Sequence, residues 1–193
     1  MTTKKRRRSK NKTCSNRPYT SQDYQSNDGM LTTVWGPSMW HVLHTMSFNY
    51  PVDPSCDEKH QYRDFVLSLS HVLPCGKCRK NLRKNLAKLP LTLDHMKSRA
   101  TFSKYMYELH ELVNDMLHKT SGLTYAEVRD RYEHFRSRCT LSPSEMVEKQ
   151  KKPEDGCTEP LYGERSKCVL HIMPQKEKCA TFQMDKACIK KRK

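Results

Sequence analysis

Residues 55–89, SCDEKHQYRDFVLSLSHVLPCGKCRKNLRKNLAKL, predict two consecutive helices joined at a proline. Ser55 and Glu58 have the spacing of a Ser-x-x-Glu capping box, which marks the start of a helix. Apolar residues at helical spacing follow on one face: Tyr62, Phe65, Val66, Leu69, Val72 and Leu73. Pro74 ends this helix because proline lacks a backbone N–H. A second stripe of Cys78, Leu82, Leu86 and Leu89 follows, so the pair Cys75 and Cys78 should lie at the N-terminus of the second helix.

Three more helices are predicted on either side of this stretch. Upstream, Gly36 and Pro37 mark a helix start, with an apolar stripe of Trp35, Met39, Val42, Met46 and Tyr50 and an adjacent line of Trp40 and His44. Downstream, a stripe of Phe102, Tyr105, Met106, Leu109, Val113, Met116 and Leu117 predicts a helix ending near Lys119. The last begins at a Thr124–Glu127 capping box and carries Tyr125, Val128, Tyr132, Phe135 and Cys139. No segment alternates with period two, so we predict an all-α five-helix bundle, a four-helix bundle plus a short fifth helix.

Composition predicts tails around this core. Only 35% of the residues are apolar, 30% are charged, and the formal net charge is +15. Residues 1–33 are polar and basic without an apolar period, and residues 140–193 are rich in Lys, Cys and Pro. We therefore predict a disordered basic N-terminal tail (1–33), a folded domain (34–139) and a flexible C-terminal tail (140–193). The basic runs 4–12 and 186–193 could bind nucleic acid or direct import into the nucleus.

No stretch approaches the roughly 20 apolar residues that cross a bilayer, and no secretory leader is recognisable at the N-terminus. We therefore expect a protein of the cytoplasm, with a nuclear location possible through the basic run. Nine cysteines are many for a reducing compartment. Without a leader they point to metal binding or redox catalysis rather than to a secreted disulfide scaffold.

Cys75-Gly76-Lys77-Cys78 is the sharpest chemical feature. Two intervening residues let a disulfide close across one helical turn, and the helix N-terminus, Lys77 and Arg79 should all favour thiolate over thiol. A zinc site is the alternative, but it needs a second ligand pair. The core contains none, and Cys168-x-x-His171 lies in the predicted tail. A thioredoxin-like protein would need strands, which the core lacks.

Four motifs together resemble the Erv/ALR family of FAD-linked sulfhydryl oxidases: WGPSMWHVLHT at 35–45, Tyr50-Pro51, LPCGKC at 73–78 and HELVNDMLHK at 110–119. The resemblance spans Trp35 to Cys139 and is strongest to short versions from large DNA viruses, so it suggests a viral origin. A viral origin would imply a location in the host cytoplasm, the viral factory or the virion. It implies a helical domain that binds FAD, and an enzyme that passes electrons from protein dithiols through Cys75–Cys78 to flavin and then to oxygen, giving hydrogen peroxide.

By matching position, the resemblance also implies site residues. Cys78 would be the thiolate nearest the flavin, and Cys75 the sulfur that exchanges with substrate thiols. The predicted FAD contacts are Gly36, Trp40, His44, His110, Asn114 and Lys119. A metal ligand set of His110, Asn114 and His118 lacks an acidic or thiolate partner, so no metal is predicted.

The chain departs from the family pattern at several positions. Pro37 replaces a basic residue, and Glu111 replaces the first Asn of a His-Asn-x-Val-Asn motif. The two cysteines that often link the fourth helix to the following loop are replaced, by our alignment, by Tyr107 and Thr124. Losing both members of this disulfide leaves no unpaired thiol.

The resemblance also implies a second, shuttle disulfide on a flexible arm and a homodimer formed through the first two helices. The tail cysteines are Cys14, Cys157, Cys168, Cys179 and Cys188. We favour a C-terminal arm, with Cys14 instead able to pair with Cys139 between subunits. Zinc held by Cys157, Cys168, His171 and Cys179 is the competing use of the arm. Two other functional classes remain open, a zinc-stabilised adaptor protein and a basic nucleic-acid-binding protein without oxidase activity.

Overall fold

The computed structural model describes residues 18, 20–138 and 157–168. Its described residues form helices and no β-strand, apart from an isolated bridge between Ser137 and Pro160. The elements are α1 (Ser21–Tyr24), α2 (Thr32–Phe48), α3 (Cys56–Val72), α4 (Gly76–Lys88), the 3-10 helix η1 (Leu93–Met96), α5 (Arg99–Met116) and α6 (Tyr125–Glu133). The predicted all-α fold is confirmed, with α2 to α6 as the predicted helices.

Local side-chain bonds explain where the helices start. The Ser55 hydroxyl accepts from the Glu58 N–H at 3.2 Å, and the Glu58 carboxylate accepts from the Ser55 N–H at 2.8 Å. Thr124 and Glu127 form the same reciprocal pair before α6. Both predicted capping boxes are therefore present, and each satisfies two N–H groups that a helix start leaves without a backbone partner.

The predicted start of the first long helix was wrong. α2 begins at Thr32, so Pro37 lies inside the helix rather than at its first position. Proline cannot donate to the carbonyl four residues earlier, which belongs to Thr33. Thr33 is exposed, so water can satisfy that carbonyl and the helix can continue through Pro37. The short elements α1 and η1 carry no long apolar stripe and were not predicted.

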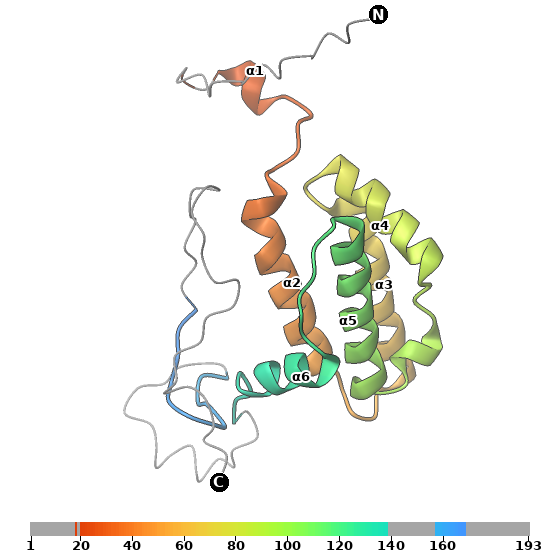
Figure 1. Cartoon of the computed structure of the whole chain (residues 1–193), viewed down its shortest axis with the longest axis vertical. Helices are drawn as coiled ribbons and strands as arrows, with labels where there is room; N and C mark the ends of the chain where they lie inside the picture. The colour runs from red at the N-terminus through yellow and green to blue at the C-terminus, as the bar shows by residue number, and fades with distance from the viewer. Residues whose placement is uncertain (1–17, 19, 139–156, 169–193) are drawn as a thin grey trace, which may run out of the picture.

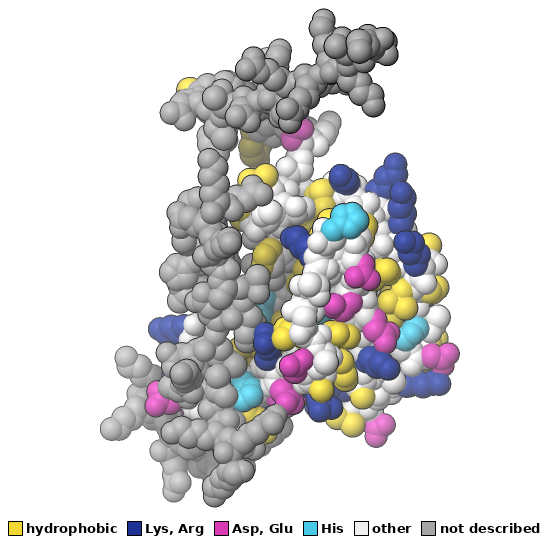
Figure 2. Space-filling model, in the orientation of Figure 1, with side chains coloured by type: hydrophobic (Ala, Val, Ile, Leu, Met, Phe, Trp, Pro, Cys, Tyr) yellow, Lys and Arg dark blue, Asp and Glu magenta, His cyan; other side chains and the backbone are white. Residues whose placement is uncertain are grey.

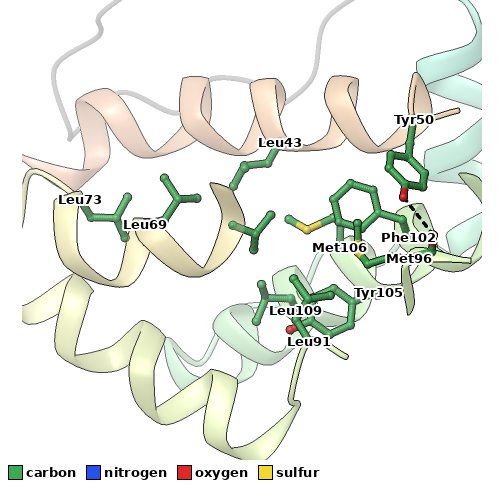
Figure 3. Packing of buried hydrophobic residues seen from close by; sticks show 11 residues of the cluster. Leu43, Tyr50, Leu69, Leu73, Leu91, Met96, Phe102, Tyr105, Met106 and Leu109 are labelled. Carbon is green, nitrogen blue, oxygen red and sulfur yellow. Dashed lines mark hydrogen bonds between the residues drawn. The ribbon is translucent and has the colours of Figure 1, made fainter. Parts of the chain in front are cut away.

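The long helices pack side by side, with α2 against α5, α3 against α4, and α6 across one end of α2 and α5 (Figure 1). Their shared core includes the fully buried Phe102, Tyr105 and Met106 of α5. The Tyr50 hydroxyl donates to the Met96 carbonyl at 3.0 Å, inside this cluster (Figure 3). Each large apolar side chain buried in this way contributes about 1.5–3 kcal/mol, so the core holds the helices that carry the site.

A hydrogen bond joins α5 to the loop before α6. The Tyr107 hydroxyl donates to the Leu123 carbonyl at 2.7 Å, and the Tyr107 ring lies 5.9 Å from that of Tyr125. Thr124, the second position at which a linking cysteine was expected, follows directly and caps α6. The two replacements therefore meet at one junction, where hydrogen bonds and ring packing connect the two elements.

The predicted tails fall largely outside the described residues, so the domain boundaries stay predictions. Residues 20–33, within the predicted N-terminal tail, contain α1 and the first two residues of α2. Cys139 and the basic runs 4–12 and 186–193 are not among the described residues. In the described part of the chain, no helix is both long and apolar enough to cross a membrane.

Candidate active site

Cys75 and Cys78 lie at the start of α4. Cys75 is the N-cap residue, and its sulfur accepts a hydrogen bond from the Cys78 backbone N–H at 3.2 Å. Both cysteines are thiols in this structure, and both are half-buried. The predicted position at a helix N-terminus is therefore confirmed, and the two sulfurs face each other across the first turn.

The two thiols differ in acidity. A hydrogen bond with the Cys78 thiol lowers the pKa of Cys75, with help from the backbone N–H groups of the first turn and the charge of Arg79. Burial raises the pKa of the Cys78 thiol. The local environment therefore favours thiolate at Cys75 and opposes it at Cys78, because Cys78 packs against the hydrophobic core. Cys75 is thus the better exchanging thiol of the pair.

A short segment before α2 lies against Cys75. The Met30 N–H donates to the Pro74 carbonyl at 3.1 Å, and the Trp35 indole N–H donates to the Met30 carbonyl at 3.2 Å. A Cβ at Gly29 would stand 3.0 Å from the Pro74 oxygen and 3.1 Å from the Cys75 Cα. Only glycine allows this approach without a shift, so the segment leaves one side of Cys75 covered by backbone.

A cavity of about 1480 Å³ opens beside the dithiol. Its lining includes every residue predicted for the site: Cys75, Cys78, Gly36, Trp40, His44, His110, Asn114 and Lys119. They come from α2, α4, α5 and the turn after α5, which are far apart in sequence. The fold therefore brings the predicted thiols and the predicted cofactor contacts to one hollow, and their individual roles remain predictions.

Trp40, His44 and His110 form the best-defined wall of this cavity. The Trp40 and His110 rings are stacked, with centroids 3.9 Å apart and planes 7° from parallel. His44 Nε2 and His110 Nδ1 are 2.9 Å apart. Burial lowers the pKa of His44 to about 3 and that of His110 to about 4, and for His44 the nearby His110 adds to the effect. Both imidazoles are therefore neutral at pH 7, so this wall offers flat rings and one shared proton.

The far end of α5 supplies the polar part of the lining. The Asn114 side-chain amide donates to the Glu111 carboxylate at 3.0 Å, and the Lys119 N–H donates to the Asn114 carbonyl at 2.9 Å. His118 has a φ of 54°, in the left-handed region, and turns the chain so that Lys119 returns to the cavity. Glu111, one of the departures from the family pattern, is thus bonded to a predicted cofactor residue.

Sequence reasoning did not place Asn85, His41 and Tyr132 at the site, although all three line the cavity. Asn85 is only 2% exposed, and its side-chain nitrogen has no hydrogen-bond partner. Asn85 lies two turns after Cys78 on the same face of α4. A polar residue within this apolar stripe was the one sequence signal that could have identified it. His41 and Tyr132 also line the cavity, with His41 Nδ1 at 3.3 Å from the Tyr132 hydroxyl. That pair joins α2 to α6, and no local pattern reveals it.

The tail cysteines are only partly described. Cys168 is a free thiol whose residue lines the cavity, and Cys157 is disulfide-bonded. Cys14, Cys179, Cys188 and His171 lie outside the described residues, so neither the shuttle nor the zinc use of the arm is tested. Among the residues that the structure describes, no group of three or more His, Cys, Asp or Glu side chains could hold a metal ion.

Comparison with known proteins finds similar FAD-linked sulfhydryl oxidases. The chain is 36% identical over 114 residues to a probable FAD-linked sulfhydryl oxidase of Acanthamoeba polyphaga mimivirus, a match covering 59% of this chain and 76% of that protein. It is 30% identical over 99 residues to an FAD-linked sulfhydryl oxidase of African swine fever virus, covering 51% of this chain and 80% of the viral one.

A solved structure of the FAD binding domain of Erv1 from Saccharomyces cerevisiae is 27% identical, with a TM-score of 0.49, and the match covers 53% of this chain and 94% of that one. The model of the Erv1 / Alr family matches residues 37–136. This range is just over half of the chain and contains both thiols and most of the cavity wall. The chain therefore belongs to the Erv1/Alr family.

Proposed function

We propose that this chain is an FAD-linked sulfhydryl oxidase that forms disulfide bonds in protein dithiols. Electrons would pass from the substrate through Cys75 and Cys78 to FAD and then to oxygen, giving hydrogen peroxide. The observation that carries the proposal is the meeting of this dithiol with Trp40, His44 and His110 around one cavity. Family membership and the names of the viral relatives support the same activity.

The cavity suits a large, flat, polar cofactor. Its volume of about 1480 Å³ exceeds the roughly 300–1,000 Å³ typical of small-molecule pockets. Two lining residues each carry a buried polar atom without a partner, His44 Nδ1 and the Asn85 side-chain nitrogen. Leaving such an atom unbonded costs about 1–3 kcal/mol, so a ligand with acceptors is favoured. A Cβ at Gly36 would meet nothing within 4 Å, which leaves open space beside α2.

Residues of this chain have distinct tasks toward FAD. The parallel rings of Trp40 and His110 offer a stacking surface for an aromatic ring system. His44 and Asn85 offer hydrogen-bonding groups inside the cavity, and Lys119 offers a positive charge that suits a diphosphate. FAD, when bound, supplies a two-electron acceptor that oxygen can reoxidise.

Cys75 and Cys78 carry the thiol chemistry. In the oxidised enzyme a substrate thiolate attacks Cys75 Sγ, the Cys75–Cys78 bond breaks, and Cys78 leaves as the thiolate. The second substrate thiolate then attacks the substrate sulfur of the mixed disulfide and releases Cys75. The substrate loses two electrons and two protons, which the enzyme dithiol gains. Cys75 suits the outer role because of its lowered pKa, and Cys78 suits the inner role because it packs against the core.

Purified protein is expected to be yellow and to release FAD on heating. Asn85→Leu removes a donor from the cavity while keeping a similar side-chain volume, so it should weaken FAD binding about tenfold, the effect of losing one buried hydrogen bond. The same change removes a buried, unpaired amide from the flavin-free protein and should leave its melting temperature equal or higher. Equilibrium titration of flavin-free protein with FAD, and thermal unfolding without FAD, measure the two effects.

A correctly folded, colourless protein that takes up no added FAD would contradict the proposed function. Unchanged FAD affinity in Asn85→Leu would show that another group, such as a water molecule, satisfies the Asn85 amide. Loss of melting temperature in that variant would instead indicate a structural role for the amide.

We also propose a homodimer that pairs through α2 and α3. Exposed apolar side chains on these helices support it: Val34 and Val42 on α2, and Phe65 and Val72 on α3, are between 38% and 66% exposed. Sedimentation equilibrium at micromolar concentration should give twice the 22.7 kDa chain mass. Val42→Glu with Phe65→Glu should shift the protein to monomer because paired interfaces exclude unpaired charge. A wild-type chain that is monomeric throughout that range would contradict the dimer.

A further inference from the structure

One face of α4 carries a line of lysines. Lys77, Lys80, Lys84 and Lys88 follow at spacings of three or four residues, which places them on one stripe of the helix. All four are exposed, and Figure 2 shows Lys and Arg side chains gathered over α4. At 1.5 Å per residue the stripe is about 16 Å long. We call these four residues the lysine stripe.

At its far end the lysine stripe approaches acidic side chains of α5, because Lys88 lines a hollow together with Glu108, Glu111 and Asp115. α4 contains no acidic residue, and none of the ion pairs formed among the described residues includes one of its lysines. Like charges three and four residues apart destabilise a helix, and cations in a first turn oppose the helix dipole. The stripe therefore lowers the stability of the isolated helix, and an anion bound along it would offset this cost.

The position of the lysine stripe selects the kind of anion. Lys77 lies between Cys75 and Cys78 in the sequence and lines the same cavity, so the stripe begins in the helical turn that carries both thiols. The other side of Cys75 is covered by the backbone of Gly29 and Met30. A polypeptide that brings a thiol to Cys75 can then lie along α4. Nucleic acid carries no thiol, so it has no reason to be aligned with the dithiol.

We propose that the lysine stripe binds an acidic segment of the substrate polypeptide, next to the substrate's cysteines. A stripe of about 16 Å matches about five residues of extended chain at ~3.3 Å each. This inference rests on the proposed oxidase function for the thiol step, but the charge recognition can be measured without turnover. It makes acidic dithiol proteins the preferred substrates.

The test compares three dithiol peptides that are identical except for an acidic, neutral or basic five-residue flank, with dithiothreitol as the small substrate. At low ionic strength the full chain should oxidise the acidic peptide with a kcat/KM about tenfold above the neutral one, since each exposed charge pair contributes a factor of about two to three. The combined variant Lys80→Gln, Lys84→Gln, Lys88→Gln should lose this preference. Added salt at 0.5 M should do the same in the native chain, because it screens exposed charges.

The matched control removes the same charge elsewhere. The control is the triple variant Lys59→Gln, Lys97→Gln, Lys104→Gln, whose substitutions lie on α3, beside η1 and on α5. This variant should keep the preference for the acidic peptide. Oxidation of dithiothreitol should be unchanged in both triple variants, because Lys77 and the cysteines are intact. An acidic peptide with serines in place of its cysteines should bind the full chain, by fluorescence anisotropy, about tenfold more tightly than it binds the α4 variant.

Equal rates for the three peptides in the native chain, together with equal binding, would overturn the proposal. So would a control variant that loses the preference as fully as the α4 variant. A single-stranded oligonucleotide that binds through α4, when the acidic peptide does not, would assign the stripe to nucleic acid. Failure of dithiothreitol oxidation would reject the proposed function instead, and peptide binding would still decide this inference.

Discussion

Cys75→Ser and Cys78→Ser are each expected to lower turnover of a dithiol substrate by at least about a thousandfold while the protein stays folded. Thiol–disulfide exchange needs both sulfurs, because one accepts the substrate and the other leaves. Serine is a favoured helix N-cap, so Cys75→Ser keeps the contact that the Cys75 sulfur makes with the Cys78 N–H. Oxygen uptake and peroxide release measure turnover, and circular dichroism checks the fold.

The two variants should differ in their spectra. With FAD bound, Cys75→Ser leaves a single sulfur on the core side of the pair, and Cys78→Ser removes it. Any long-wavelength absorbance from a Cys78 thiolate beside flavin can appear only in the first variant, and it should grow with pH because burial raises the pKa of Cys78. Cys56→Ser is the matched control, because Cys56 is an exposed free thiol at the start of α3, and it should be fully active. Full activity of either site variant would disprove the electron path.

Acid should destabilise the flavin-free protein through His44 and His110. Burial lowers the pKa of these groups from the usual 6.5 to about 3 and about 4. Below pH 6.5 the unfolded chain therefore binds protons that the folded chain excludes, so the free energy of unfolding falls as pH falls. Each histidine contributes up to about 1.4 kcal/mol per pH unit. Between pH 7 and pH 4.5 the loss should be about 3–5 kcal/mol, a large part of a typical stability of about 5–15 kcal/mol.

Urea unfolding at pH 7 and pH 4.5 measures this loss. Carboxylates also respond to acid, so the native chain is compared with a His44→Leu, His110→Phe double variant. Between pH 7 and pH 4.5 the double variant should lose about 3–5 kcal/mol less of its free energy of unfolding than the native chain. A double variant of the exposed His60 and His71, changed to glutamine, should behave like the native chain. If the native chain and the His44 and His110 variant lose equal stability, these imidazoles are not excluded from protonation in the folded state.

The sequence predicted the helices and the place of the dithiol because both depend on local signals. The capping boxes at Ser55 and Thr124, the break at Pro74 and the apolar stripes between them act within a few residues. The predicted start of α2 was wrong because a helix can contain a proline such as Pro37 when the carbonyl that loses its N–H donor is exposed to water. Gly29 lacks any local signal, because its need for a small residue comes from Pro74 and Cys75 on a distant segment.

The sequence predicted which residues form the candidate site. It did not predict the contacts between those residues or the pKa values of their side chains. Spacing alone paired Trp40 with His44, and His110 with Asn114. It could not show that His44 and His110 meet across two helices at 2.9 Å, nor that burial separates the acidity of Cys75 from that of Cys78. Asn85 was overlooked because an amide in an apolar stripe becomes informative only when its surroundings are known to leave it unpaired.

The hydrogen bond between Tyr107 and Leu123 connects α5 to the loop before α6 without a disulfide, so this connection does not depend on the redox state of the cysteines. Among residues 20–138 the cysteines are Cys56, Cys75 and Cys78, and all three are free thiols. The junction between α5 and α6 is held by a hydroxyl, a carbonyl and two aromatic rings, none of which responds to reductant. A strongly reducing environment can therefore convert Cys75–Cys78 to the dithiol without loosening the junction between α5 and α6. The proposed cycling of Cys75 and Cys78 between disulfide and dithiol would thus leave this junction between α5 and α6 intact.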